Sequence, residues 1–590
     1  MFGPLKKLPR LLQWDGRRRS SRQDEPLLRH LANKHILLRL TIVWLTTLTV
    51  TAFAIWWGVP TRFRVGEKYP YDLRSRVDFT VINHVELVNQ ERQRVGENGD
   101  FVHEKATYTE RPVFEKYPRD MLLVPRGQPI LDRQIDLLKE EHQAYCESLT
   151  TTDHWSRGVS LFMILSLLTA LMVMYVARFQ TCLAQSLPMI AGVCVLILTT
   201  LVLGTVLSQP PWNALLLPMT FTAMVLTLAY NPQFALMMTF ALELALTVVL
   251  GTRVDHLLIH MGGMATAILS LRHVRTRTQL VQVASAAGLA YFITTLATGL
   301  LSEQTWSLML TDAFRFLLWG SLAGFVLTGL LPVVERCFSF VTDISLLELA
   351  DGSHPLLQEL VRRAPGTYTH SMTVATLAEA SAEAIGANPL LVRVGSYFHD
   401  IGKMMKPHYF IENQAGENRH DALEPALSTL IIIGHVKDGL ALAQQYHLPK
   451  PIMEFIASHH GTTLVEYFYR EAMRMHESSG EQSGLGSRAA DLEACFRYPG
   501  PKPQSRELGV LMMADAVESS SRSLATPTPG SLRKLVHDLL MKRLLDGQFE
   551  ESGLTLTELH VIEESLCKSL IALFHARIKY PEAESESKAA

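Results

Sequence analysis

The sequence has few cysteines, no large excess of charge of either sign, and no glycine-rich phosphate-binding loop (P-loop) at Gly402-Lys403. Its six cysteines form no Cys-x-x-Cys pair and have no regular spacing, which excludes a disulfide framework. The formal net charge is −2, so no strongly basic or acidic balance indicates a charged partner, and we expect no DNA or RNA to bind. Tyr397 stands where a P-loop would have its first glycine, so Gly402-Lys403 is no P-loop.

Charge is also scarce along one long stretch of the chain. Residues 157–333 are nearly uncharged and rich in Leu, Thr, Met and Ala, whereas the part that follows carries most of the histidines and many charges. A chain of 590 residues is long enough for three or four units at roughly 150 residues per domain. The composition therefore predicts a membrane domain followed by a soluble domain.

The first apolar run, residues 36–59, predicts a transmembrane anchor, because roughly 20 apolar residues cross a bilayer as a helix. Residues 1–35 before it form a basic arm that we expect in the cytosol. A cleaved signal peptide is the rival interpretation, but the run is long for one and no Ala-x-Ala site follows it. We therefore predict an uncleaved anchor.

Seven further apolar runs fill the predicted membrane domain, residues 156–333. Lys and Arg favour the cytosolic side, and Arg178 and the cluster Arg272, Arg275 and Arg277 fall there when the amino terminus is inside. The sequence thus predicts a multi-pass protein of the cell (inner) membrane whose amino terminus and catalytic domain are cytoplasmic. The seven runs are 159–177, 187–207, 214–230, 233–251, 256–271, 280–301 and 313–333.

Residues 60–155 return to a soluble composition and are predicted to form a small mixed extracytoplasmic domain. Residues 77–81 alternate like a strand, while 86–94 and 131–145 are predicted as helices. No ligand cluster or nucleophile motif stands out here. A spacer is the simpler interpretation, and a ligand sensor is the alternative.

A metal-site pattern stands out in the carboxy-terminal part. The adjacent pair His399-Asp400 offers one imidazole nitrogen and one carboxylate that can bridge two ions. The apolar residues 511–514 predict that Asp515 is buried, and a buried carboxylate needs a cation or a hydrogen-bond donor. The predicted ligands are His370, His399, Asp400, His435, His459, His460 and Asp515.

These residues resemble the HD-domain metal-dependent phosphohydrolases, and the flanking sequence is similar to the seven-transmembrane HD family of cyclic di-AMP phosphodiesterases. The motifs that carry the resemblance are PGTYTHS at 365–371, YFIENQ at 409–414, HVKDG at 435–439 and FRYPGPKPQS at 496–505. The resemblance implies hydrolysis of cyclic di-AMP to 5′-pApA. It also implies two ions, one held by His370, His399, Asp400 and Asp515, the other by Asp400, His435, His459 and His460.

A pair of ions about 3.5–4 Å apart lowers the pKa of a bridging water and stabilises both the attacking and the leaving oxygen of a phosphodiester. Histidine with carboxylate suits Mn(II), Fe(II), Co(II) or Zn(II) better than Mg(II). We expect two divalent transition-metal ions, Mn²⁺ or Fe²⁺ first, and we expect Asp400 and Lys403 to be catalytic.

The remaining sequence predicts an all-α fold, apart from the small external domain. Residues 334–364 are a predicted juxtamembrane linker, a strand or turn leading to a helix, and 365–580 are the predicted all-helical HD domain. The polar run 477–488 is expected to be a flexible insertion, and 581–590 a disordered tail. A helix is predicted from His370 onward, another from Pro389 to His399, and more at about 421–433, 436–446, 450–460, 463–476, 505–523, 529–545 and 556–575.

Three charged residues have two interpretations each. Lys403 either contacts a substrate phosphate or forms a structural ion pair. Arg522 shares a helix face with Asp515 and Glu518, so it either reaches a substrate phosphate or pairs with Glu518. Glu243 lies inside an apolar run, where a structural hydrogen bond is favoured over a transport role because the spans hold few other polar groups.

The sequence therefore predicts a membrane-bound, metal-dependent phosphodiesterase that acts on cyclic di-AMP in the cytosol. The alternatives are the same chemistry on another cyclic dinucleotide or on (p)ppGpp, and a receptor or transporter whose HD domain only binds a nucleotide. The expected partners are the cyclic dinucleotide and the lipid bilayer, and an external ligand and a homo-oligomer are left open.

Overall fold

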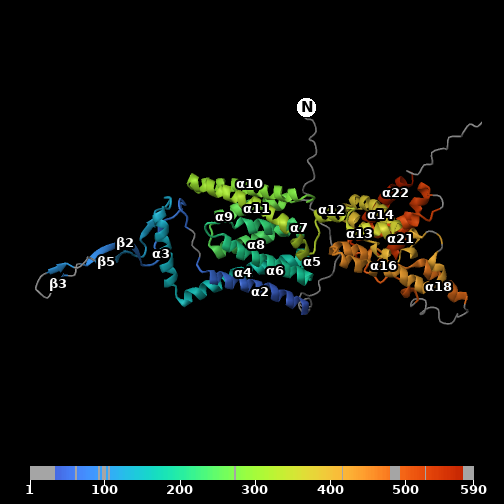
Figure 1. Ribbon diagram of the computed structural model, residues 1–590, viewed down its shortest axis with the longest axis horizontal. Helices are drawn as coiled ribbons and strands as arrows, with labels where there is room; N and C mark the ends of the chain where they lie inside the picture. The colour runs from blue at the N-terminus through green and yellow to red at the C-terminus, as the bar shows by residue number, and fades with distance from the viewer. Residues whose placement is uncertain are drawn as a thin grey trace, which may run out of the picture. The chain divides into compact units, whose positions relative to one another are not determined.

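The computed structural model describes residues 34–59, 63–90, 93–95, 101–103, 107–271, 274–414, 416, 418–478, 492–524 and 527–575. Nearly all of the predicted basic arm and insertion, and the whole predicted tail, lie outside these residues. Most of the described chain is helical (Figure 1). The all-α fold class with a small mixed domain is confirmed.

The chain divides by its contacts into two compact units. One comprises residues 1–222, 237–261 and 292–315, and the other comprises 223–236, 262–291 and 316–590. The border between the units passes through membrane helices. It does not test the predicted domain borders at residues 156, 334 and 365, which stay predictions.

All eight predicted apolar runs form helices. Seven described helices are long and apolar enough to cross a membrane, but one of them, α16 (Pro425–Gln445), carries His435 and lies in the predicted HD domain. Two predicted spans, α7 and α9, are apolar helices of only 14 and 17 residues. The eight helices are α2 (Lys34–Trp57), α4 (Thr151–Phe179), α6 (Leu187–Leu207), α7 (Leu216–Ala229), α8 (Pro232–Leu250), α9 (Val254–Ser270), α10 (Arg277–Leu301) and α11 (Trp306–Phe338).

The first helices pack along one another. Helix α2 runs beside α4 and α6 (Figure 1), with a hydrogen bond of 2.9 Å between the hydroxyl oxygens of Thr47 and Thr169. The short helix α5 (Thr181–Gln185) joins α4 to α6. Glu243 and His260 are buried, and Glu243 Oε1 lies 2.7 Å from His260 Nδ1. The structural hydrogen bond predicted for Glu243 is therefore present.

The segment that follows α2 binds three loops between membrane helices. Arg64 donates to Asp312 Oδ2 at 2.8 Å and to Asn213 Oδ1 at 2.9 Å. The backbone N–H of Lys68 donates to Gln304 Oε1 at 2.9 Å, and Arg253 donates to the Lys68 carbonyl at 3.3 Å. The loops after α6, α8 and α10 therefore lie at the same end of the helices as this segment.

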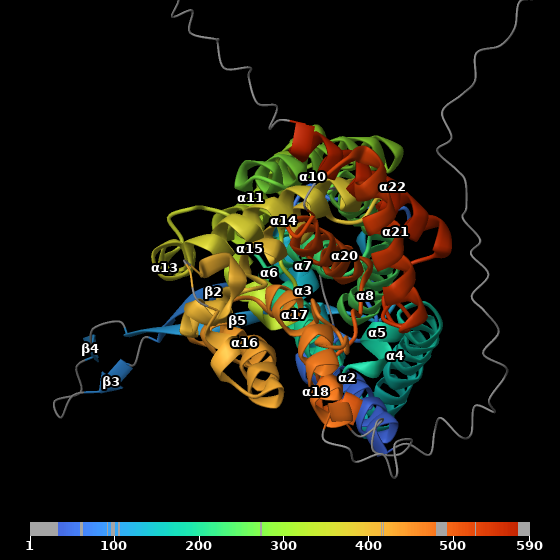
Figure 2. The same ribbon diagram turned by 90° about the vertical axis from the view of Figure 1, so that its right-hand side faces the viewer.

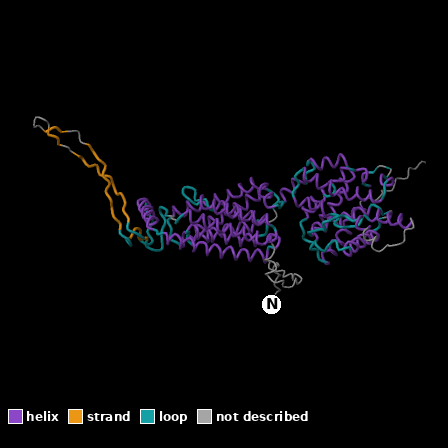
Figure 3. Tube along the Cα trace, turned by 90° about the horizontal axis from the view of Figure 1, so that it is seen from below, coloured by secondary structure: helices purple, strands orange, loops and turns teal. Residues whose placement is uncertain are grey.

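The segment between α2 and α4 is built on antiparallel strand pairs, drawn in orange in Figure 3. Strand β2 (Phe79–Gln90) pairs antiparallel with β5 (Thr107–Tyr117), β3 (Gln93–Val95) with β4 (Phe101–His103), and β1 (Leu73–Arg74) with β6 (Leu122–Val124). Helix α3 (Asp132–Ser148) confirms the helix predicted at 131–145. The helix predicted at 86–94 is wrong, since residues 86–90 belong to β2 and residues 93–94 to β3. Asn98-Gly99, the dipeptide most typical of tight hairpins, was the overlooked sequence signal.

Within the predicted linker, a turn at residues 339–342 leads to helices, which agrees with one of the two predicted forms. Helix α11 continues to Phe338, and α12 (Asp343–Leu349) and α13 (Pro355–Arg363) follow it. Glu335 near the end of α11 accepts hydrogen bonds from the backbone N–H and the hydroxyl of Thr342, which itself caps α12. These bonds satisfy the orphan N–H groups at the start of α12 and thereby stabilise the helix.

The predicted HD domain is all-helical (Figure 2). The two helices predicted at 421–433 and 436–446 are one continuous helix, α16, because Gly434 costs a helix interior only about 1 kcal/mol and both halves pack on the domain. Pro389 follows the N-cap Asn388 as predicted. The other helices are α14 (Pro365–Ala384), α15 (Pro389–Phe398), α17 (Lys450–Ser458), α18 (Glu466–Ser478), α20 (Arg506–Ser521), α21 (Pro529–Leu545) and α22 (Leu556–His575).

Four short 3-10 helices connect α15 to α16. They are η1 (Ile401–Met405), η2 (Pro407–Tyr409), η3 (Ile411–Asn413) and η4 (Arg419–Ala422). Glycine permits the closest approaches: a Cβ on Gly402 would lie 1.9 Å from the His435 carbonyl oxygen, and one on Gly366 would lie 1.8 Å from the Glu412 carbonyl oxygen. These contacts hold η1 against α16, and η3 against the start of α14.

Candidate metal centre

The seven predicted ligands come from five elements of the HD domain. His370 lies on α14, His399 caps the end of α15 with Asp400 directly after it, and His435 lies on α16. His459 and His460 follow α17, and Asp515 lies on α20. All except His460 are buried. The fold thus brings together side chains from distant parts of the sequence.

The side chains form two groups that share Asp400. His370, His399, Asp400 and Asp515 offer ligand atoms that lie within 4.8 Å of one another, and so do Asp400, His435, His459 and His460. We call these the carboxylate-rich group and the histidine-rich group. The division is the same as the one that the family resemblance implies.

Asp400 presents a different oxygen to each group. Its Oδ2 lies 3.4 Å from His370 Nε2 and 3.3 Å from His399 Nε2. Its Oδ1 lies 3.3 Å from His435 Nε2 and 3.5 Å from His459 Nε2. A carboxylate in this position can bridge two ions.

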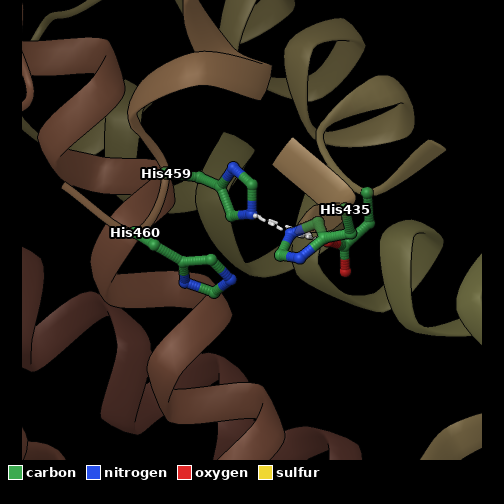
Figure 4. Close-up of side chains that lie close together, drawn as sticks. His435, His459 and His460 are labelled. Atoms are coloured by element: carbon green, nitrogen blue, oxygen red, sulfur yellow. Dashed lines mark hydrogen bonds and ion pairs between the residues drawn. The ribbon is translucent and has the colours of Figure 1, made fainter. Parts of the chain in front are cut away.

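The histidine-rich group is drawn in Figure 4, where the rings of His435 and His459 face each other and His460 lies beside them. The two Nε2 atoms of His435 and His459 are 3.2 Å apart. The ring centroids of His459 and His460 are 4.0 Å apart. Because α17 ends at Ser458, these neighbours are free of the 100° spacing of an α-helix, and both reach the same group.

The outer ring nitrogens fix how the imidazoles are presented. Nδ1 lies 2.7 Å from the Ser396 carbonyl oxygen in His399, 2.5 Å from that of Ile432 in His435, and 2.9 Å from that of Ile456 in His459. A carbonyl only accepts, so each Nδ1 carries the proton and donates. With its proton on Nδ1, each ring turns Nε2 toward Asp400 and its neighbours, which is how metal-ligating histidines are commonly oriented.

His370 has a carboxylate in place of the carbonyl. Its Nδ1 lies 2.5 Å from Glu518 Oε2, and its Nε2 lies 3.1 Å from Asp515 Oδ1. Glu518 therefore orients the ring and increases the basicity of the nitrogen that faces the group.

Buried polar atoms without hydrogen-bond partners converge on the centre. Among the described residues they include His370 Nε2, His399 Nε2 and Asp400 Oδ1. Leaving such atoms unpaired is costly, and a divalent cation would satisfy all three together. Imidazole and carboxylate are also the ligand types that first-row divalent metals accept. The residues present thus fit the divalent metal that an HD domain implies.

The two groups differ in their electrostatics. Burial lowers the pKa of His399, but Asp400 and Asp515 outweigh it and raise that pKa to about 9. Burial and neighbouring imidazoles lower the pKa of His459 below its usual value, and that of His460 well below it. Burial raises the pKa of Asp400, yet His399 and Lys403 hold it well below its usual range.

Lys403 lies at the edge of the centre, on η1. Its Nζ is 2.7 Å from Asp400 Oδ2 and 2.9 Å from Glu412 Oε1. Burial lowers the pKa of Lys403, but the two carboxylates outweigh it and raise that pKa above its usual value. The ammonium is therefore charged beside the predicted bridging carboxylate, and it has the ion pairs of the structural interpretation.

Arg522 is bound to a neighbour on its own helix. Its Nε donates to Glu518 Oε1 at 2.8 Å, and its side chain is 43% exposed. The structure therefore has the helix ion pair that was the alternative to phosphate binding. Arg522 is linked to the centre only through Glu518 and His370.

Sequence reasoning missed the outer partners of the ligands. Glu518 was considered only as a partner of Arg522, although its spacing from Asp515 places both on one helix face. Glu412 lies within the YFIENQ motif, and Tyr498, whose ring centroid is 4.3 Å from that of His460, lies within the FRYPG motif. Neither motif indicates by itself which side chain approaches the centre.

Two family models match the chain. Residues 155–342 match the model described as a 7TM receptor with intracellular HD hydrolase, and residues 367–520 match the HD domain. The first segment contains the seven helices from α4 to α11 other than the short α5. The predicted similarity to seven-transmembrane HD proteins is confirmed: one segment matches the membrane-region model and the other matches the HD-domain model.

Known relatives refine the comparison. The cyclic-di-AMP phosphodiesterase PgpH of Listeria monocytogenes is 37% identical over 379 residues, which are 62% of this chain and 50% of the relative. PgpH of Bacillus subtilis is 42% identical over 294 residues, which are 49% of this chain and 40% of the relative. This chain thus spans half or less of the length of these curated relatives.

A solved structure is also similar in sequence. The crystal structure of the L. monocytogenes PgpH HD domain in complex with cyclic-di-AMP is 44% identical. It covers 38% of this chain and 100% of the solved chain, with a TM-score of 0.35.

Proposed function

We propose that this protein hydrolyses cyclic di-AMP to linear 5′-pApA at the metal centre of its HD domain. The observation that carries the proposal is the pair of four-residue groups that share Asp400, with one carboxylate oxygen facing each group. The substrate is taken from the two PgpH relatives, whose names state a cyclic-di-AMP phosphodiesterase. Geometry supports the reaction class, and similarity supports the nucleotide.

The proposed cofactors are two divalent transition-metal ions, Mn²⁺ or Fe²⁺ first. His370, His399, Asp400 and Asp515 would hold one ion, and Asp400, His435, His459 and His460 the other. When bound, such a pair supplies Lewis acidity and an activated water for attack at phosphorus. The mixed imidazole and carboxylate ligands favour these metals over Mg²⁺, which prefers oxygen ligands.

The residues around the ligands perform the remaining tasks. The carbonyls of Ser396, Ile432 and Ile456 keep the protons of three imidazoles on Nδ1, so that Nε2 stays available as a ligand. We propose that the charged ammonium of Lys403 stabilises negative charge that develops on the phosphoryl oxygens. Glu412 then serves to position this ammonium, since its Oε1 accepts a hydrogen bond from Lys403 Nζ at 2.9 Å.

We also propose that the amino terminus and the HD domain face the cytoplasm. The segment after α2 and the loops after α6, α8 and α10 are bonded at one end of the helices, as an eight-span path requires. Arg275 and Arg277, which approach Asp343 and Glu348 of α12, belong to the opposite end. An excess of basic residues marks the cytoplasmic side.

Two other functions remain as alternatives with less support. The same centre could cleave another cyclic dinucleotide or (p)ppGpp, since the ligands alone do not select the base. A receptor whose HD domain binds a nucleotide without cleaving it is the alternative from a different class. The complete set of seven converging side chains favours an enzyme over a binding module.

The direct test uses the full-length protein in detergent or nanodiscs, loaded with Mn²⁺ or Fe²⁺. It would be incubated with cyclic di-AMP, cyclic di-GMP, cyclic GMP-AMP and (p)ppGpp, and the products would be separated by chromatography. We expect pApA from cyclic di-AMP at the highest kcat/KM, and none from the Asp400→Ala variant. Faster cleavage of another nucleotide would replace the substrate, and binding without cleavage would replace the enzyme.

The topology has its own test. A reporter fused after the last residue, and a cysteine placed in the segment 120–126 of the external part, would be probed in intact cells. We expect the carboxy-terminal reporter to be active only as a cytoplasmic fusion and the cysteine to react with an impermeant reagent. The reverse result would overturn the proposed orientation.

A further inference from the structure

An arginine near the metal centre is half-buried and, among the described residues, has no hydrogen-bond partner. Arg543 lies in the last turn of α21, and its Nε is buried without a hydrogen bond. Among the described residues, no hydrogen bond or ion pair of any kind involves its guanidinium. A guanidinium has five donors and stays charged, so a buried Nε without a partner is costly unless an anion binds there.

Two neighbouring cationic side chains, Arg497 and Lys542, are paired with carboxylates. Arg497 donates to Glu493 and Asp546 and to the carbonyl of Thr462. Lys542, next to Arg543 in sequence, is half-exposed and pairs with Glu466. The local carboxylates are thus already paired with other cations, whereas Arg543 is not.

The end of α21 packs beside the turn that carries His459 and His460, because the Thr462 N–H donates to Gln548 Oε1 at 3.0 Å and Arg497 bridges the Thr462 carbonyl and Asp546. Burial lowers the pKa of Arg543, and the charges that act against this effect are those of Asp515, Asp546, Tyr498 and Glu466. Asp515 is a predicted metal ligand, and the Tyr498 ring stacks beside His460. By contrast, Lys403 is held on the other flank by Asp400 and Glu412.

We propose that Arg543 binds the second phosphate of the cyclic dinucleotide, the one that is not cleaved. This inference rests on the proposed function. A cyclic dinucleotide carries two phosphodiester groups in one ring, and two metal ions act on only one of them. The other phosphate is still an anion, and a planar guanidinium can bind its two free oxygens with parallel hydrogen bonds.

The experiment compares a substrate with two phosphates and one with a single phosphate. Full-length wild-type protein and the Arg543→Gln variant would be assayed with cyclic di-AMP and with bis(p-nitrophenyl) phosphate, a small diester. We expect the variant to raise KM for cyclic di-AMP about 10- to 100-fold, as for loss of a hydrogen bond to a charged group. Its kcat/KM for the small diester should equal that of the wild type.

Matched variants separate binding from charge and from folding. Lys542→Gln removes the adjacent cation and should leave KM for both substrates unchanged. Arg543→Lys keeps the positive charge but cannot form two parallel hydrogen bonds to a phosphate. Its KM for cyclic di-AMP should therefore lie between those of the wild type and Arg543→Gln. Metal content and the thermal unfolding midpoint would be measured for each variant. If Arg543→Gln fails to fold, Arg543→Lys takes its place, and its KM for cyclic di-AMP and its kcat/KM for the small diester are compared with those of the wild type in the same way.

The outcomes distinguish this assignment from the proposed function. Unchanged KM for cyclic di-AMP in the Arg543 variants would overturn the assignment alone. Equal losses on both substrates, or a loss of metal, would also overturn it, because the residue would then support the centre itself. A wild-type protein that cleaves the small diester but not cyclic di-AMP would overturn the proposed function and this assignment with it.

Discussion

The carboxylate-rich group and the histidine-rich group of the candidate metal centre are built from different side chains. The carboxylate-rich group combines two carboxylates with two imidazoles, and Glu518 adds a third carboxylate behind His370. The histidine-rich group has three imidazoles and only the shared Asp400. In the first group the pKa of His399 is raised to about 9, whereas in the second the pKa values of His459 and His460 are lowered.

This difference shows that the groups around an imidazole, and not its presence in a sequence motif, determine its protonation state. Where carboxylates outnumber cations, histidines tend to hold protons, and a metal must compete with them. Where imidazoles crowd together, the pKa values of His459 and His460 are lowered, which favours neutral rings that can ligate a cation. The same seven residues in another arrangement would not give two adjacent sites.

The largest effect is expected from removing the residue that the two groups share. Asp400→Ala should lose both ions and reduce cyclic di-AMP turnover to the background, because each group loses a carboxylate oxygen. Elemental analysis of the full-length protein should show about two metal equivalents in the wild type. A variant that keeps one full equivalent would show that Asp400 does not serve both groups.

A smaller loss of metal should follow when one group is damaged and the other is left whole. His435→Ala should lose one equivalent and keep the ion of the carboxylate-rich group, and His370→Ala should do the reverse. Elemental analysis and metal titration of the two variants would be compared side by side. Loss of both ions in each variant would mean that the groups form a single cooperative site.

Lys403 should affect chemistry without affecting metal content. Lys403→Ala should keep both ions but lower kcat by about 10²–10³, as for the loss of one electrostatic donor. Lys406→Ala is the matched control, because Lys406 is an exposed lysine three residues away. Normal turnover of Lys403→Ala, or a loss of its metals, would leave only the structural ion pair as its role.

The smallest effect is expected from the outer carboxylate of the carboxylate-rich group. Glu518→Gln should weaken metal binding to that group by about 10- to 100-fold, the usual cost of losing such an outer partner, and excess Mn²⁺ should restore turnover. Arg522→Ala should weaken it less, because Glu518 would still hold His370. A raised KM for cyclic di-AMP in Arg522→Ala would instead support the phosphate contact first predicted for Arg522.

The sequence by itself determined the helical class, the eight apolar helices and the seven candidate ligands. Local patterns in the sequence predict these features: apolar runs of bilayer length, and a His-Asp pair with further histidines around it. Such patterns can be recognised without knowing which residues are in contact. Prediction from the local sequence was wrong where a partner strand distant in the sequence determines the secondary structure. Residues 86–94 have a polar composition that suits a helix, but 86–90 pair with β5 and 93–94 pair with β4, so both segments are strands.

Only the tertiary structure decided which oxygen of Asp400 faces which group, that Glu518 orients His370, and that Arg543 has no hydrogen-bond partner among the described residues. Each of these facts depends on the packing of α14, α16, α20 and α21 against the turns after α15 and α17. Spacing along the chain cannot supply them, because direction and burial of a side chain arise only when separate helices meet.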